Sequence, residues 1–381
     1  MFFLNMKKTV LIIALAALLC ACSKDKDPES KGFTKVANYL YEYEADDYGD
    51  MPPTVLPGLD RKIAFGCSSV RNGNFYGRNY DFTINETCEF VVRTKATAER
   101  PHASIGIANP AFIDITDEMA LSGLSDDVLK FIPWMTMDGI NDAGLICSSN
   151  MVNMIDLDEQ HEHTNPGKPQ IDDLYLVRTI LDNCGNVTEA LAFINEHDIV
   201  PPPVELFGSS DLHLMIADSN STVVVEFLNG ETKITNTNIT TNLYNFKYEN
   251  ENVFFPHSCG IERYGILKAN YESGNSMEGM WELLKSVRYS YTYDATMVPF
   301  WASEYYEHFP GTSTATPAEE ILNNELTQYI INAYQIFSET GTYNPLDGMW
   351  FTTHNTTYDM NKRELWLTIR ENYETRYTFK L

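Results

Sequence analysis

Apolar runs of strand length recur along the first part of the chain. They fall at about 62–70, 74–82, 88–95, 131–139 and 144–152. Turn residues separate them, as at Asn72-Gly73 between the first two runs. Short runs of this kind, bounded by glycine and asparagine, are typical of strands joined by tight turns. The pattern therefore predicts a block of β-strands.

Helical periodicity replaces this pattern from residue 173. Residues 173–184 carry apolar side chains at helical spacing, and Asn186 with Glu189 forms a capping box for a second helix. Residues 212–218 and 222–228 then predict a hairpin.

Further helices and strands are expected in the C-terminal part. Helical patterns cover about 260–271, 276–288 and 317–337, and strand patterns cover 348–358 and 364–379. Blocks of strands alternating with blocks of helices predict sheets that carry helices on their outer faces.

Residues 1–22 have the pattern of a targeting signal. Lys7 and Lys8 precede the apolar run Thr9–Leu19, which is shorter than the roughly 20 residues of a membrane span. The following Leu-Cys-Ala-Cys is similar to a bacterial lipoprotein cleavage box, with Cys22 as the lipidated residue. We expect an exported lipoprotein, in the periplasm or at the cell surface, whose contact with the membrane is this lipid.

Residues 23–66 read as a polar tether and propeptide ahead of a catalytic domain at 67–381. Tyr39, Tyr41 and Tyr43 have the alternating spacing of a half-buried strand, yet they fit a disordered acidic tether equally well. If the chain is cut before the catalytic domain, we expect the lipid-bearing fragment to stay in the membrane. At least a fraction of the catalytic chain, from Cys67 onward, should then become soluble.

The composition indicates the size of the core and the kinds of partner that the protein can bind. The 381 residues are 44% hydrophobic, enough for one large catalytic domain with a sizeable core. The net charge of -26 repels phosphate backbones, which excludes nucleic acid as an expected partner. The acidity is better explained by a solvated exported surface than by cationic substrates. The oligomeric state stays open, a homo-oligomer included.

Five cysteines remain outside the targeting signal. An odd number without CxxC spacing argues against a zinc site or a complete disulfide framework. An odd number leaves one thiol without a disulfide partner, as expected if one cysteine is a nucleophile. The polar stretch Asp156–His163 has metal-capable side chains but no familiar ligand spacing. The five cysteines are Cys67, Cys88, Cys147, Cys184 and Cys259.

Cys67 stands in a strand-type run directly after Gly66. A cysteine thiol titrates near pH ~8.5 and needs a base at neutral pH. Breaking the bond between the two residues would place an α-amine, with a pKa of about 7.7 to 8.0, beside the thiol. Arg78 would then hold negative charge near the thiolate, and Asp81 would accept hydrogen bonds from the ammonium. The alternative is a buried structural cysteine followed by an ordinary hairpin.

Two motifs around this cysteine carry a resemblance. Cys67-Ser-Ser-Val followed by Gly77-Arg-Asn-Tyr-Asp-Phe resembles the opening of the choloylglycine hydrolase family, which includes bile salt hydrolases and penicillin V acylases. It is also similar to linear amide hydrolases of the acid ceramidase and isopenicillin acyltransferase type. The resemblance implies that Cys67 is the nucleophile and that Arg78 and Asp81 orient and tune it. It further implies an α+β fold, the four-layer αββα sandwich of N-terminal nucleophile hydrolases, with no metal or organic cofactor.

Four later segments extend the resemblance to about residue 381. Met137–Leu145, followed by Cys-Ser-Ser-Asn150, is similar to the hairpin that ends in an oxyanion-hole asparagine, which implies that role for Asn150. Thr240-Thr-Asn-Leu-Tyr-Asn-Phe246 resembles the segment whose asparagine donates to the oxyanion, here Asn242. The family's last active-site arginine corresponds to Arg263, and residues 352–367 resemble the closing hairpin.

Together these features predict an amidase that cleaves a linear carbon-nitrogen bond of a small-molecule amide through a Cys67 thioester. An acyltransferase, which passes the acyl group to an amine, and a noncatalytic surface lipoprotein that keeps the fold are the alternatives. Conjugated bile acids, penicillin V-like amides, N-acyl lactones and lipid amides all remain open as substrates.

Overall fold

The computed structural model describes residues 32–51, 66–83, 88–110, 115–153, 163–200, 210–247, 249, 261–288 and 350–381. The predicted leader, the first seven residues of the stretch Asp156–His163 and the helix at 317–337 lie outside these ranges. Within the described part, no helix has the length and apolarity that a membrane crossing requires.

The described strands form two large sheets. The nine-stranded sheet runs in the order β1-β2-β5-β6-β7-β8-β11-β12-β13, and the six-stranded sheet in the order β14-β3-β4-β15-β16-β17. The first consists of β1 (Phe33–Ala37), β2 (Leu40–Ala45), β5 (Glu89–Thr94), β6 (Ser104–Ala108), β7 (Thr136–Asn141), β8 (Ile146–Asn153), β11 (Ser210–Ala217), β12 (Thr222–Leu228) and β13 (Glu231–Thr235). The second consists of β14 (Ile239–Thr240), β3 (Gly66–Asn72), β4 (Phe75–Thr83), β15 (Trp350–Asp359), β16 (Glu364–Ile369) and β17 (Tyr377–Lys380). A separate parallel pair joins β9 (Gln170–Asp172) to β10 (Asp198–Val200).

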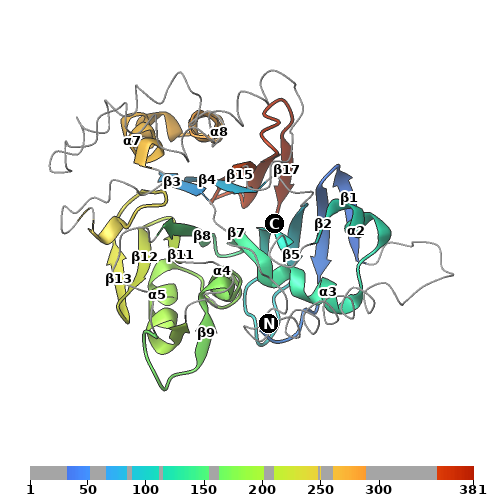
Figure 1. Ribbon diagram of the computed structural model, residues 1–381, viewed down its shortest axis with the longest axis horizontal. Coiled ribbons are helices and arrows are strands. Elements are labelled where there is room, and N and C mark those ends of the chain that lie inside the picture. The colour runs from blue at the N-terminus through green and yellow to red at the C-terminus, as the bar shows by residue number, and fades with distance from the viewer. Residues whose placement is uncertain are drawn as a thin grey trace, which may run out of the picture.

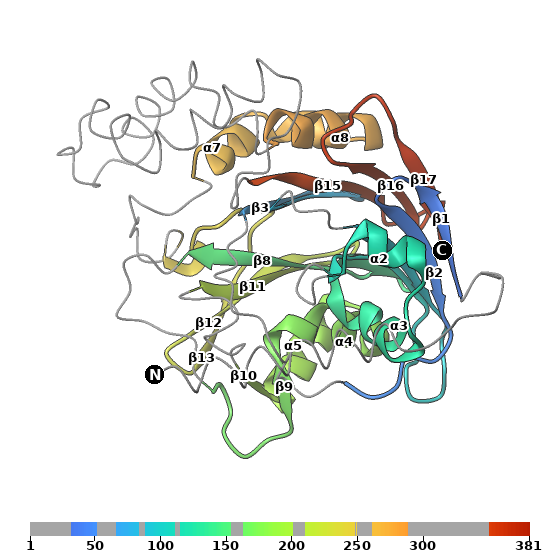
Figure 2. The same cartoon turned by 45° about the vertical axis from the view of Figure 1, so that its right-hand side comes forward.

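The two large sheets pack face to face, and helices cover their outer faces (Figures 1 and 2). Between the sheets, Tyr76 and Tyr358 of one share a buried cluster with Ile105 and Met215 of the other. Helices α4 (Leu176–Asn183) and α5 (Val187–Glu196) pack on the nine-stranded sheet, while α7 (Ile261–Ala269) and α8 (Met277–Ser286) pack on the six-stranded sheet. This order of layers confirms the predicted αββα sandwich.

Two of the predicted strands differ from the structure. Residues 131–135 are not extended: α2 (Asp117–Ser122) and α3 (Asp126–Phe131) precede a 3-10 turn at Ile132–Met135, and the strand starts only at Thr136. Ser125 caps α3 by accepting a hydrogen bond from the Val128 amide, a local signal that the apolar run concealed. The expected strand at 364–379 is divided into β16 and β17 by a turn with positive φ at Arg370.

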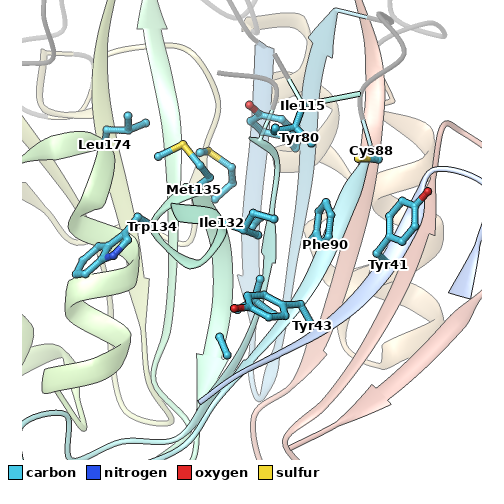
Figure 3. Close-up of a cluster of buried hydrophobic side chains, with 14 of the residues drawn as sticks. Tyr41, Tyr43, Tyr80, Cys88, Phe90, Ile115, Ile132, Trp134, Met135 and Leu174 are labelled. Atoms are coloured by element: carbon cyan, nitrogen blue, oxygen red, sulfur yellow. The ribbon is translucent and has the colours of Figure 1, made fainter. Parts of the chain in front are cut away.

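The segment ahead of the predicted cut is part of the nine-stranded sheet. Its strand β2 runs parallel to β5, with Tyr41 opposite Phe90 and Tyr43 opposite Val92. Both tyrosine side chains are buried in the core, as Figure 3 shows. Of the two readings that the sequence left open, the structure has the paired strand and not the tether.

A glycine sets how closely α8 approaches the nucleophile hairpin. A Cβ atom at Gly77 of β4 would lie 2.5 Å from Leu284 Cδ1 and 2.8 Å from Met280 Cγ. Those distances are shorter than any relaxed contact, so a larger residue would require the Leu284 and Met280 side chains to shift. The glycine of the Gly-Arg-Asn-Tyr-Asp motif is therefore favoured by packing rather than by backbone conformation.

Candidate active site

Cys67 lies in β3, on the face of the six-stranded sheet that is turned toward the nine-stranded sheet. The antiparallel register places Gly66 opposite Asp81 and Cys67 opposite Tyr80, which brings the Gly66-Cys67 bond beside β4. The side chain is fully buried. Arg78, on the same hairpin, directs Nη2 to within 3.5 Å of the Cys67 sulfur.

The surroundings favour the protonated form of the Cys67 thiol. Burial raises the pKa of Cys67, and the Arg78 guanidinium only partly offsets that rise. A buried thiol of this kind is a poor nucleophile without a base. The base must come from a group next to the sulfur, and an α-amine on Cys67 would meet that requirement.

Asn242 joins the backbone of Cys67 to a second arginine. Its Oδ1 accepts the Cys67 N–H at 2.9 Å and Arg263 Nη2 at 2.6 Å. Both partners are donors, so the side-chain oxygen must face them and the amide orientation is determined by the network. Nδ2 accordingly donates to the Met151 carbonyl at 2.6 Å.

Asp81 lies on the opposite side of the same arginine. Arg263 Nη1 forms an ion pair with Asp81 Oδ2 at 2.5 Å, and Thr352 Oγ1 donates to Oδ1 at 2.6 Å. Burial raises the pKa of Asp81 to about 6, against the opposing effect of the Arg263 charge. The carboxyl group therefore titrates close to neutral pH.

Asn150, on β8, reaches toward β3 from the nine-stranded sheet. Its Oδ1 accepts a hydrogen bond from Ser69 Oγ at 3.1 Å. The side chain is fully buried, and among the described residues its Nδ2 has no hydrogen-bond partner. An unsatisfied buried donor is rare and calls for an explanation, and a developing oxyanion is the kind of acceptor that would provide one.

All six predicted site residues thus lie in one buried region. Contacts run from Arg78 to Cys67, and from Asn242 through Arg263 to Asp81. Asn150 is joined to this group through Ser69, two residues after the nucleophile. Their proximity follows from the sheet register and from α7, which carries Arg263.

Sequence reasoning missed the residues behind Arg78. Asp138 of β7 forms a 2.9 Å ion pair with Arg78 Nη1, and His354 Nε2 lies 2.8 Å from the same carboxylate. On its other side, His354 Nδ1 is 3.2 Å from Glu89 Oε1. The carboxylate of Asp138 within an apolar strand pattern was the available signal, because a buried charge requires partners. His354 stands in a run of threonines and asparagine, which gave no such signal.

The charges of this group stabilise one another. Burial alone would raise the pKa of Asp138, but the nearby His354 and Arg78 charges lower it to about 2. Burial alone would lower the pKa of His354, yet the two carboxylates outweigh it and raise that pKa. Arg78 is therefore held between a fixed anion and the sulfur.

The described residues contain no group of three or more His, Cys, Asp and Glu side chains placed to hold a metal ion. His163, the one described residue of the metal-capable stretch, has Nδ1 2.8 Å from Asp198 Oδ2. Cys67, Cys88, Cys147 and Cys184 are buried free thiols.

The family model of linear amide C-N hydrolases, choloylglycine hydrolase family, matches residues 67–261, just over half of the chain. The chain belongs to this family. The match begins at Cys67. It ends at residue 261, so Arg263 lies two residues beyond it. No curated protein matches the sequence significantly.

Solved structures include similar proteins. A conjugated bile acid hydrolase from Clostridium perfringens has a TM-score of 0.42 at 14% identity, covering 84% of this chain and 92% of its own. A second variant of that hydrolase has a TM-score of 0.41 at 13% identity, covering 83% and 92%. Penicillin V acylase from Agrobacterium tumefaciens has a TM-score of 0.39 at 16% identity, covering 83% and 85%.

Proposed function

We propose that this protein is an amidase whose nucleophile, Cys67, becomes the first residue of the catalytic chain when the Gly66-Cys67 bond is cut. The observation that carries the proposal is the double contact at Cys67: its sulfur faces Arg78 and its N–H is held by Asn242. After cleavage, that N–H belongs to an α-amine beside a buried thiol that needs a base. The family match that begins at Cys67 supports the same assignment.

Cleavage of the chain would use the sulfur itself. The thiol of Cys67 adds to the Gly66 carbonyl carbon, the carbon-nitrogen bond breaks, and the proton passes to the new amine. Water then hydrolyses the resulting thioester, which releases the Gly66 carboxylate and restores the thiol. Glycine presents a carbonyl that no side chain shields.

Amide hydrolysis would repeat this sequence on a substrate. The Cys67 α-amine takes the thiol proton, the thiolate adds to the amide carbonyl, and the ammonium then protonates the departing amine. Water activated by the same amine resolves the thioester to a carboxylic acid. Asn150 Nδ2 and the Asn242 amide are the proposed oxyanion donors, each worth on the order of 3 kcal/mol of transition-state stabilisation.

Arg263 and Asp81 would hold the amine. In the uncut chain, Asn242 Oδ1 already accepts the hydrogen of the Cys67 nitrogen, and Asp81 is paired to Arg263 on the other side. Once the nitrogen becomes an ammonium, an ionised Asp81 opposite Gly66 in the sheet would stabilise it.

The same proposal includes the N-terminal part of the chain. Residues 1–22 would be a lipoprotein signal and 23–66 a tether and propeptide, with Cys22 lipidated and the protein exported. The substrate class stays open between bile salts, penicillin V-like amides, N-acyl lactones and lipid amides. Acyl transfer differs only in having an amine in place of water at the second step.

Intact-mass analysis tests the proposal. Purified wild type is expected to be cut between Gly66 and Cys67 and to hydrolyse at least one member of a small amide panel, whereas Cys67→Ala should stay uncut and inactive. Cys88→Ala, a change at another buried cysteine, serves as the control and should behave as wild type. Uncut protein that is nevertheless active would rule out the N-terminal nucleophile.

A further inference from the structure

Two buried ionisable side chains lie beside the segment that carries Asn242 and have no part in the chemistry above. Glu226 of β12 and His213 of β11 are each 1% exposed. His213 Nδ1 is 3.3 Å from Glu226 Oε1, and His213 Nε2 is 2.9 Å from the Thr241 carbonyl oxygen. Charged residues are rarely placed at such depth without a specific partner.

Glu226 binds the far side of the same segment. Its Oε1 accepts the Asn245 N–H at 2.7 Å and its Oε2 accepts the Phe246 N–H at 2.7 Å. Together with the bond from His213 to Thr241, these contacts grip the backbone on both sides of Asn242. Three hydrogen bonds from two side chains therefore fix a single short turn.

The hydrogen bonds also show which nitrogen of His213 carries a hydrogen. A carbonyl oxygen can only accept, so His213 Nε2 must carry a hydrogen toward Thr241. Two backbone N–H groups point at the Glu226 carboxyl group, so both of its oxygens act as acceptors. Nδ1 of His213 lies against one of these oxygens, Oε1.

The hydrogen bonds of Glu226 and His213 connect the two sheets. The chain leaves the nine-stranded sheet after β13 and enters the six-stranded sheet at β14, where Thr240 pairs with Ser69 of the nucleophile strand. Glu226 and His213 belong to the nine-stranded sheet, and His213 is paired with Asn150 in the register of β8 and β11. The pair thus links both asparagines of the site to one rigid set of strands.

We infer that Glu226 and His213 are positioning residues that hold the turn at 241–246, and with it the Asn242 side chain, against the Cys67 nitrogen. The inference rests on the proposed function for its effect on turnover, but its structural part stands without it. Neither side chain touches the sulfur; they act through the backbone of the turn.

Hydrogen exchange tests the structural part. In the wild type, the Asn245 and Phe246 amides should exchange slowly. Glu226→Gln keeps the shape but has one acceptor oxygen for two N–H groups, so exchange over 241–247 should accelerate at least 10-fold. Val225→Ala, a buried change on the opposite face of β12, should leave that turn unchanged. Equal protection in Glu226→Gln and wild type, or equal loss in both variants, would overturn the inference.

Kinetics tests the functional part on cut protein. Glu226→Gln should lower kcat at least 10-fold with KM within about threefold, whereas Val225→Ala should leave kcat near the wild-type value. If Glu226→Gln does not fold, His213→Gln takes its place, with the same expected split between kcat and KM. Wild type without amidase activity would contradict the proposed function alone, because the exchange result does not depend on it. Unchanged kcat in a folded variant would contradict the positioning role.

Discussion

Arg263 Nη2 donates a 2.6 Å hydrogen bond to Asn242 Oδ1, across 21 residues of sequence. This bond decides which end of the asparagine amide faces Cys67, because an arginine can only donate. The second nitrogen of the same guanidinium is paired with Asp81. One buried arginine therefore aligns the two side chains that are proposed to hold the nucleophile's nitrogen.

The first prediction concerns Asn242. Asn242→Ala removes the acceptor of the Cys67 N–H and a proposed oxyanion donor, so kcat should fall roughly 100-fold or more, with slower cleavage at Gly66. Steady-state kinetics and a mass time course measure both. Asn186→Ala removes the cap of α5. This control variant should lose about 1 kcal/mol of unfolding free energy and keep an unchanged kcat. Near-normal turnover in Asn242→Ala would remove this residue from the site.

The second prediction concerns pH. Burial raises the pKa of Asp81 from 3.8 to about 6 in the uncut chain, so the carboxyl group is neutral below that pH and ionised above it. Because Asp81 stabilises the Cys67 ammonium only as a carboxylate, Asp81 should contribute a limb of kcat/KM that rises with pH up to about 6. This limb lies below the one expected from the α-amine, whose ordinary pKa is about 7.7 to 8.0. The ammonium of the cut chain would move this limb to lower pH, never to higher. The sign for folding is opposite: ionising a group whose pKa is raised by burial removes stability as pH rises through that value.

A pH profile of kcat/KM measures this limb, with Asp81→Asn as the comparison. The variant should lose most activity and should lack the limb in whatever rate remains. An identical acidic limb in Asp81→Asn would assign the titration to another group.

The third prediction concerns the charge behind Arg78. Asp138→Asn leaves Arg78 and His354 without their shared anion, and breaking such a buried pair costs about 3–5 kcal/mol of unfolding free energy. Asp182→Asn is a matched control, because it breaks the buried Arg178–Asp182 pair on α4. Both should lower stability, measured by denaturant unfolding, but only Asp138→Asn should lower kcat per folded molecule. Equal kcat in the two variants would mean that Asp138 serves stability alone.

The fourth prediction concerns the segment before the cut. The leader pattern led us to expect that part of the catalytic chain is released on cleavage, but the structure changes this expectation. Tyr41 and Tyr43 are buried core residues, and Tyr48 hydrogen-bonds Asp182. The fragment that contains β1 and β2 should therefore remain bound to the catalytic chain through size-exclusion chromatography.

Cell fractionation tests the same point in place. Wild type that has been cut and uncut Cys67→Ala should both be found with the membrane if Cys22 is lipidated and the fragment stays bound. Tyr41→Ala with Tyr43→Ala should weaken the contact and release the cut chain. Release of wild type on cleavage would favour the original expectation.

The strand and helix patterns, together with the family resemblance, predicted the layers. The resemblance also proposed the six site residues, and the structure places all six in one buried region. The sequence did not predict contacts between residues that are far apart in the chain. His354 stands 216 positions from Asp138, and only the order of the strands brings them together. The same holds for Glu226, whose apolar neighbours on β12 predict a buried strand but do not reveal which amides its carboxylate binds. The run at 131–139 failed for a different reason, because an apolar 3-10 turn and a buried strand look alike by hydrophobicity.

If the chain is cut as proposed, the parallel pairing of β2 with β5 changes how the protein unfolds. Before cleavage, the two strands meet within one polypeptide, and the intervening residues close the loop between them. Afterwards they belong to separate molecules, so unfolding is also dissociation and its midpoint should depend on protein concentration. Refolding would require two partners to find each other, one of them tethered in a membrane if Cys22 carries a lipid. The cut enzyme would then persist through a slow rate of unfolding rather than through reversible equilibrium with its unfolded state.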